Sequence, residues 1–194
     1  MIGLVITVIV VMDVALLGIW LVRVYGEIHR FRGEVNCSWV QLREAIVCRR
    51  EIMPYLIASI TLKEREVVEA IGNACDLASP SAGVPEQARA ESRLNTALRN
   101  LLIVMSEHAE VHDDPSVRRI CLELQALDQR IDILRDLYNQ QVSAYNDRLN
   151  GMSARILSLF VPLKTADAFS AVNGGIRDIL ARLIHSNPPS ERSP

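Results

Sequence analysis

The sequence predicts an all-α protein in which an N-terminal transmembrane helix precedes an antiparallel bundle of long helices with coiled-coil-like packing. Three observations predict this class. The chain begins with a long apolar run, its later segments carry apolar residues at helical spacing, and aromatic residues make up only 5% of a sequence that is 49% hydrophobic. That balance favours helices packed through aliphatic side chains over β-sheets.

Residues 1–22 form the predicted membrane-spanning helix. They contain no Lys or Arg and would rise about 33 Å as a helix, enough to cross a hydrocarbon core. Asp13 costs about 2.5–3.5 kcal/mol on insertion scales, which the many apolar residues outweigh. Its carboxylate either contacts another membrane helix or is simply tolerated. Because no small-x-small site follows the run, we expect a retained anchor over residues 1–24 instead of a cleaved signal peptide.

Positive charge follows this span closely and does not precede it. The basic residues in question are Arg23, Arg30, Arg32 and Arg43. Since basic flanks stay in the cytoplasm, the pattern predicts a single-pass protein with its N-terminus outside and its helical domain in the cytoplasm. The membrane is therefore an expected partner.

Charge and cysteine content exclude other classes. A net charge of −2, with both signs interspersed, provides no basic surface for nucleic acid. The four cysteines lack the spacing of a zinc site, so we interpret them as reduced thiols that pack between helices, with two disulfides as the alternative. They are Cys37, Cys48, Cys75 and Cys121.

Apolar residues recur at steps of three and four from Val35 to Ile71, which indicates a helix. Pro54 lies inside this stretch without changing the phase, so we favour one helix kinked at Pro54 over two helices. A second helix is expected from Pro85 to His112. Its buried face is predicted to consist of Leu94, Leu98, Leu101, Leu102 and Met105.

The third predicted helix begins at a cap formed by Asp113, Asp114 and Pro115 and ends at Asn150 and Gly151. Its apolar stripe has the alternating steps of heptad packing. The stripe comprises Val117, Ile120, Leu124, Leu127, Ile131, Leu134, Tyr138, Val142, Tyr145, Leu149 and Met152.

Beyond this helix, Met152 to Phe169 is expected to pack along the bundle. Residues 176–184 form a short amphipathic helix that could lie on the membrane, on a partner or on its own bundle. The predicted organisation is an anchor at 1–24, a bundle at 25–169, an amphipathic helix at 170–186 and a disordered tail at 187–194.

Within Ile131–Asn146, Arg135 is followed by two Tyr-Asn pairs seven residues apart. Together with Trp39, Arg49 and Pro54, this pattern resembles the LemA family of bacterial membrane proteins, which also includes the magnetosome protein MamQ. The resemblance covers about residues 25–169. It implies an N-terminal anchor and a long-helix bundle in the bacterial cytoplasmic (inner) membrane, roles in envelope and membrane organisation, magnetosome membranes among them, and no established catalytic chemistry.

The two Tyr-Asn pairs are the main candidates for a structural or interaction role. Tyr138 and Tyr145 share the buried face, and Asn139 and Asn146 flank it. We interpret these polar groups as fixing helix register, in preference to binding a ligand. Arg49 falls on a buried phase, so we expect it to meet a carboxylate such as Glu91 or Glu123.

His108 and His112 lie four residues apart and could share one metal ion, but the order H-x-E-x-H lacks the H-E-x-x-H arrangement of metalloproteases. We therefore interpret His108 and His112 as part of a solvent-exposed helix end in preference to a metal site. No cofactor and no small-molecule substrate are expected.

The sequence therefore predicts a non-catalytic single-pass membrane protein that presents a rigid helical bundle for self-association, for assembly with other membrane proteins or for membrane organisation. The alternative is a metal-binding protein or metal-dependent hydrolase that uses His108 and His112. A lipid-sensing device based on residues 176–184 is a third hypothesis.

Overall fold

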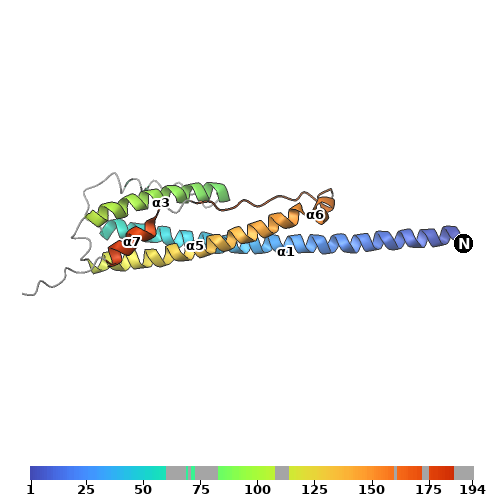
Figure 1. Cartoon of the computed structure of the whole chain (residues 1–194), viewed down its shortest axis with the longest axis horizontal. Helices are drawn as coiled ribbons and strands as arrows, with labels where there is room; N and C mark the ends of the chain where they lie inside the picture. Colours follow the sequence, from blue (N-terminus) through green and yellow to red (C-terminus); the bar gives the residue numbers. More distant parts are fainter. Residues whose placement is uncertain are drawn as a thin grey trace, which may run out of the picture. The chain divides into compact units, whose positions relative to one another are not determined.

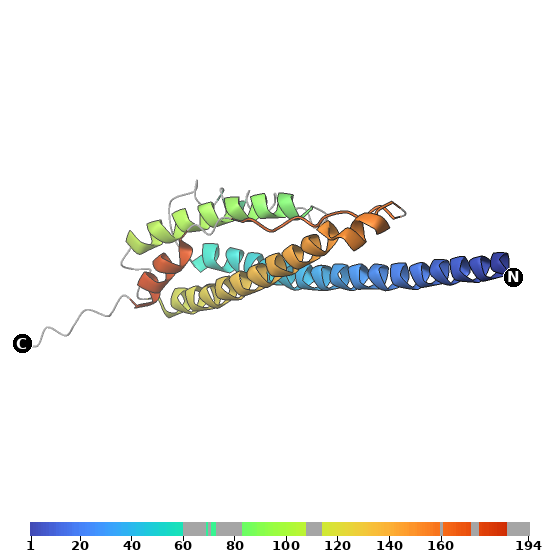
Figure 2. The ribbon, with the colours of Figure 1, turned by 45° about the vertical axis from the view of Figure 1, so that its right-hand side comes forward.

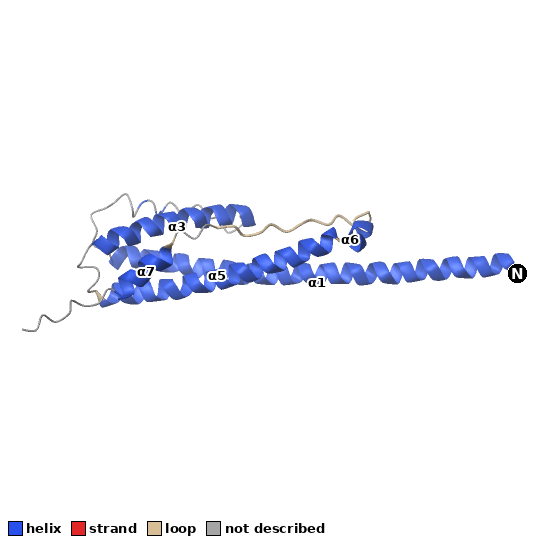
Figure 3. Cartoon of the chain, in the orientation of Figure 1, coloured by secondary structure: helices blue, strands red, loops and turns tan. Residues whose placement is uncertain are grey.

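The computed structural model describes residues 1–59, 69, 71–72, 83–107, 114–159, 161–171 and 175–185. Within these ranges every regular element is a helix (Figure 3). The all-α class with a long apolar N-terminal helix and packed helices after it is confirmed. The predicted domain boundaries stay predictions, and the tail at 187–194 lies outside the described residues.

Helix α1 runs from Ile2 to Ser59 and contains Pro54. The expected continuation of the helix through Pro54 is confirmed as far as Ser59, whereas most of the following stretch lies outside the described residues. The predicted span and the first bundle segment thus belong to one continuous helix. None of the described side chains in the apolar window near the N-terminus is buried. Among the described residues, α1 is the one helix long and apolar enough to cross a membrane.

Helix α3 runs from Val84 to Glu107 and buries all five residues predicted for its inner face. Helix α5 runs from Pro115 to Asn150. Its start is capped as expected, because the backbone N–H of Ser116 donates to Oδ1 of Asp114 at 2.7 Å. Proline suits this first helical position, since its missing N–H would have no intrahelical acceptor there.

After α5 the chain does not continue in phase. Gly151 is extended, with φ −66° and ψ 153°, and the short helix α6 then runs from Met152 to Leu157. This break moves Met152 off the buried stripe, so its side chain is 81% exposed and the prediction of burial is wrong there. Residues 162–171 have no helical or strand structure, and helix α7 runs from Ile176 to His185.

The chain forms two compact units, and α1 and α5 each contribute to both. The first unit comprises residues 1–40 and 137–167, and the second comprises residues 41–136 and 168–194. In the second unit, α3 runs in the same direction as α1, and α5 runs opposite to both (Figures 1 and 2). The predicted antiparallel packing thus holds for α5 against each of these helices and is wrong for α3 against α1.

The core of the second unit is formed by aliphatic residues of α1, α3 and α5 together with the apolar face of α7. Ile176, Leu180, Leu183 and Ile184 are all buried in it. Of the three surfaces considered for this amphipathic helix, its own bundle is the one that covers its apolar side.

The cysteines differ in their surroundings, and none of those described forms a disulfide. Cys121 is buried, which raises the pKa of its thiol to about 11, whereas Cys37 and Cys48 are exposed. The interpretation as helix-packing thiols therefore holds for Cys121 and is wrong for Cys37 and Cys48. Cys75 lies outside the described residues.

Candidate functional site

A buried network of ions joins three helices of the second unit, α1, α3 and α5. Arg49 on α1 donates from Nη1 to Oδ1 of Asp128 on α5 at 2.8 Å, and its Nη2 contacts Oε2 of Glu91 on α3. Arg50 donates from Nε to the other oxygen of Glu91 at 3.0 Å. Of the two carboxylates predicted for Arg49, Glu91 is correct, while Glu123 is exposed and lies elsewhere.

The side chains of this network are almost completely shielded from water, at 4% exposure for Arg49, 2% for Glu91 and 9% for Asp128. Burial by itself lowers the pKa of Arg49. The charges and hydrogen bonds of Glu91 and Asp128 raise it by more, so the net pKa lies above the usual value. The guanidinium therefore stays charged. A guanidinium buried this deeply is tolerated because its Nη1 and Nη2 groups each contact a carboxylate.

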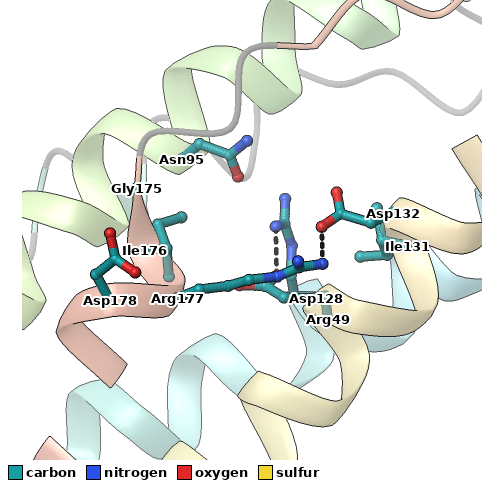
Figure 4. Close-up of a pocket in the computed structure, with 9 residues that line it drawn as sticks. All are labelled: Arg49, Asn95, Asp128, Ile131, Asp132, Gly175, Ile176, Arg177 and Asp178. Atoms are coloured by element: carbon teal, nitrogen blue, oxygen red, sulfur yellow. Dashed lines mark hydrogen bonds and ion pairs between the residues drawn. The ribbon is translucent and has the colours of Figure 1, made fainter. Parts of the chain in front are cut away.

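A pocket of about 250 Å³, lined mostly by charged and polar residues, lies over this network (Figure 4). Arg177 on α7 reaches across it to Oδ2 of Asp132 on α5, and Arg135 also contacts Asp132, at 3.2 Å from Oδ1. Among the described residues, Nε of Arg49 has no hydrogen-bond acceptor. The pocket can take water or a small polar group. Its described lining is completed by Asn95, Ile131, Gly175, Ile176 and Asp178.

The Tyr-Asn pairs perform a different task in the first unit. Tyr145 donates its hydroxyl to the carbonyl of Lys164 at 2.9 Å, and Tyr138 donates to the carbonyl of Asp167 at 2.8 Å. Asn146 makes two bonds to Ala166, donating from Nδ2 to its carbonyl at 2.9 Å and accepting its N–H at 3.0 Å. The side-chain amide thus pairs with one peptide unit as a neighbouring strand would.

The spacing of these bonds follows from two geometries. Tyr138 and Tyr145 are seven residues apart on a helix, about 10.5 Å, and their acceptors are three residues apart on an extended chain, about 10 Å. Two helical turns therefore match three extended residues. Tyr138, Tyr145 and Asn146 thus hold an extended segment on α5. Their bonds go to the main chain of 164–167 and not to another helix, so the interpretation of these three residues as a lock on helix register is wrong. For Asn139 it stays a prediction.

Tyr138 also packs against α1; we call Tyr138, Tyr145 and Asn146 together the Tyr-Asn seam. The ring centroids of Trp39 and Tyr138 lie 5.4 Å apart with a tilt of 48°, a favourable aromatic geometry. Tyr138 is 2% exposed. Its burial, with a smaller contribution from the charge of Asp167, raises its pKa to about 12. Asn139, next to it, is half-buried.

The ion network and its pocket include residues that were not predicted as site residues, among them Arg50, Asp128, Asp132 and Arg177. A signal for Asp128 was present, because it lies between Leu124 and Ile131 at steps of four and three on the buried stripe. Asp132 and Arg177 carried no comparable signal. Pro54 belongs neither to the network nor to the seam and lines a separate groove on α1 and α5.

The metal candidates cannot be placed, since His108 and His112 lie outside the described residues. Among the residues that the structure describes, no group of three or more His, Cys, Asp or Glu side chains gathers at one point.

Comparison with known proteins identifies the family. The model of the LemA family matches residues 38–178, more than half of the chain. The chain belongs to the LemA family. The match includes the ion network and both Tyr-Asn pairs. No curated protein matches this LemA-family chain. Family membership and the candidate span of α1 together indicate a membrane protein.

Proposed function

We propose that this chain is a non-catalytic, single-pass protein of the bacterial inner membrane, whose cytoplasmic helical domain serves protein assembly or membrane organisation. The observation that carries the proposal is the division of α1. From Gly3 to Val22 its apolar side chains are almost all exposed, whereas from Leu42 to Leu56 the same helix contributes buried residues to the core. Lipid is the environment that would cover the first part.

The two hydrogen-bonded features support a structural role. The Arg49 network uses its carboxylates to neutralise arginines, and the Tyr-Asn seam uses its hydroxyls and amide to hold backbone. These groups are engaged in fixing the fold. A domain made rigid in this way suits a surface that other proteins recognise.

Membrane extraction tests the anchor. The full chain should remain in the membrane pellet after alkaline carbonate washing, and a variant without residues 2–22 should be released in a folded state. Release of the full chain by carbonate would contradict the proposal. So would firm retention of the shortened variant.

Site-specific photocrosslinking tests assembly. A photoreactive residue at Tyr55 or Ile133, both largely exposed at 68% and 62%, should give discrete adducts in native membranes, either with a second copy or with a defined membrane protein. The same probe at buried Leu98 is the matched control and should give only intramolecular products. Absence of discrete adducts from both exposed sites would contradict an assembly role.

The metal-dependent alternative has a separate test. Elemental analysis of the purified full chain should find no stoichiometric metal. A bound metal that is lost in a His108→Ala/His112→Ala variant would favour the alternative over the assembly role.

A further inference from the structure

The most exposed apolar side chains beyond the candidate span, among those described, lie at α6 and the turn after it. Met152 and Leu159 are each 81% exposed, and Ile156 is 42% exposed. Soluble surfaces seldom gather large apolar groups in this way, and such patches mark contacts with proteins or membranes.

Met152 and Ile156 lie on one side of α6, and Leu159 extends that side into the turn that follows. They stand at positions i, i+4 and i+7, and the helical hydrogen bonds continue past α6, since Ser158 N–H donates to the carbonyl of Ala154 at 2.8 Å and Val161 N–H to that of Leu157 at 3.0 Å. Ala154 and Leu157 occupy the opposite side and are buried. The short segment is therefore apolar on both sides, and only one side is covered.

The position of α6 along α1 indicates what covers the exposed side of this segment. Residues Ser153 and Ala154 line a pocket of about 300 Å³ together with Val24 and Ile28 of α1. Val24 is two residues, or about 3 Å, beyond the end of the predicted span. Figures 1 and 2 show α6 beside α1 at the end of α5. Within the first unit, α6 thus lies level with the boundary between span and domain.

The surrounding residues are those of a membrane interface. Trp20 and Tyr25 lie on α1 on either side of this level and are exposed, as in the aromatic belts of membrane proteins. Arg23 and Arg155 are exposed at the same level. Arg148 is engaged by Glu27 at 3.6 Å and lies over the ring of Phe31. Exposed arginines beside an apolar face are typical of segments that lie in the headgroup region.

We propose that α6 and its following turn, residues 152–159, form a second membrane contact, with Met152, Ile156 and Leu159 inserted into the lipid interface beside the span. This inference rests on the proposed membrane insertion of α1. It assigns lipid, and not a second copy of the chain, as the occupant of this face, because the face is continuous with the level at which α1 would leave the bilayer.

Depth-dependent quenching in vesicles tests the contact. The full chain, with its four cysteines replaced by alanine, receives an environment-sensitive fluorophore through Leu159→Cys and is reconstituted into phosphatidylcholine–phosphatidylglycerol vesicles. We expect a blue-shifted emission that brominated lipids quench, more strongly when the bromine lies near the headgroup than at the chain end. Val40→Cys is the matched control: it is 53% exposed and 16 residues beyond Val24 on the same helix, about 24 Å, and should not be quenched.

A third label at Val22→Cys separates this inference from the proposed function. Quenching at position 22 without quenching at 159 would overturn the α6 contact and leave the anchor intact. Absence of quenching at both positions would overturn both. A blue shift at 159 that depends on protein density and not on brominated lipid would show that a second copy covers the face, which also overturns the proposal. If the cysteine-free chain does not fold, a fluorescent amino acid at position 159 of the native chain gives the same readout.

Discussion

Arg49 links α1, α3 and α5 through charge in an otherwise aliphatic core. Its two carboxylate partners come from two different helices, so removing the arginine affects both contacts at once. In its absence Arg50 still pairs with Glu91, whereas Asp128 loses its one basic partner among the residues that the structure describes. The energetic effect should therefore be far larger than that of a surface pair.

Replacing Arg49 by Met should lower the free energy of unfolding by about 3–5 kcal/mol, because a buried carboxylate then lacks its counter-charge. Chemical denaturation in detergent, followed by circular dichroism, measures the change. The control is Arg30→Met, which breaks the exposed Arg30–Glu34 pair and should cost at most about 0.5 kcal/mol. Equal effects of the two substitutions would refute the role of the network. A triple variant that also replaces Glu91 and Asp128 by apolar residues should recover much of the loss.

Tyr138 gives the fold a dependence on alkaline pH. Its pKa rises from 10.0 to about 12 in the folded state, so between these values the unfolded chain loses the phenolic proton while the folded chain keeps it. Stability should be unaffected below pH 10 and should fall by on the order of 2 kcal/mol as the pH approaches 12. Denaturation at successive pH values measures this slope. A Tyr138→Phe variant should lose it, whereas Tyr55→Phe, at an exposed position, should retain it; a slope unchanged by Tyr138→Phe would contradict the assignment.

The extended segment 161–167 depends on α5 for its position, since its described backbone bonds to α5 come from Tyr138, Tyr145 and Asn146. A segment without its own secondary structure needs such partners, because buried peptide groups that lack them are costly. The segment and the second half of α5 should therefore lose order together.

Asn146→Leu should lower stability by about 1–3 kcal/mol, because the N–H and carbonyl of Ala166 both lose their partner. Hydrogen exchange should accelerate at residues 164–167 before the rest of the unit. Asn146→Asp keeps the acceptor but not the donor, so its effect should be intermediate at neutral pH. Gln140→Leu, at an exposed position of the same helix, serves as control. Unchanged exchange at Ala166 in the Leu variant would show that the amide does not hold this segment.

The elements that follow from periodicity alone could be predicted, and those that depend on a choice between surfaces could not. The inner face of α3 and the start of α5 at Pro115 follow from spacing and capping. The location of α7 does not follow from the sequence, because one amphipathic face fits lipid, a partner or a core equally well. Nor do the acceptors of Tyr138 and Asn146, because main-chain carbonyls are the same in every residue and leave no trace in the sequence.

The orientation of the whole chain across the membrane has a direct reporter in Cys48, which is exposed on α1 and lies beyond the span. If the domain faces the cytoplasm, a chain that retains only this cysteine should react with an impermeant thiol reagent in lysed cells and not in intact ones. A chain with Gly3→Cys as its only cysteine is the matched control and should react in intact cells. Labelling of Cys48 in intact cells would show that the domain lies outside the cytoplasm.

The continuity of α1 also determines where its one acidic span residue points. Phe31 follows Asp13 by 18 residues, about five full turns, and Val24 follows it by 11, about three. Val24 and Phe31 both line the pocket beside α6, so the carboxylate of Asp13 lies on the same side of α1 as that pocket. A neighbouring membrane helix that offers Asp13 a hydrogen-bond donor must then approach along that flank, directly over α6, and would displace lipid from the place where the turn at Leu159 meets the bilayer.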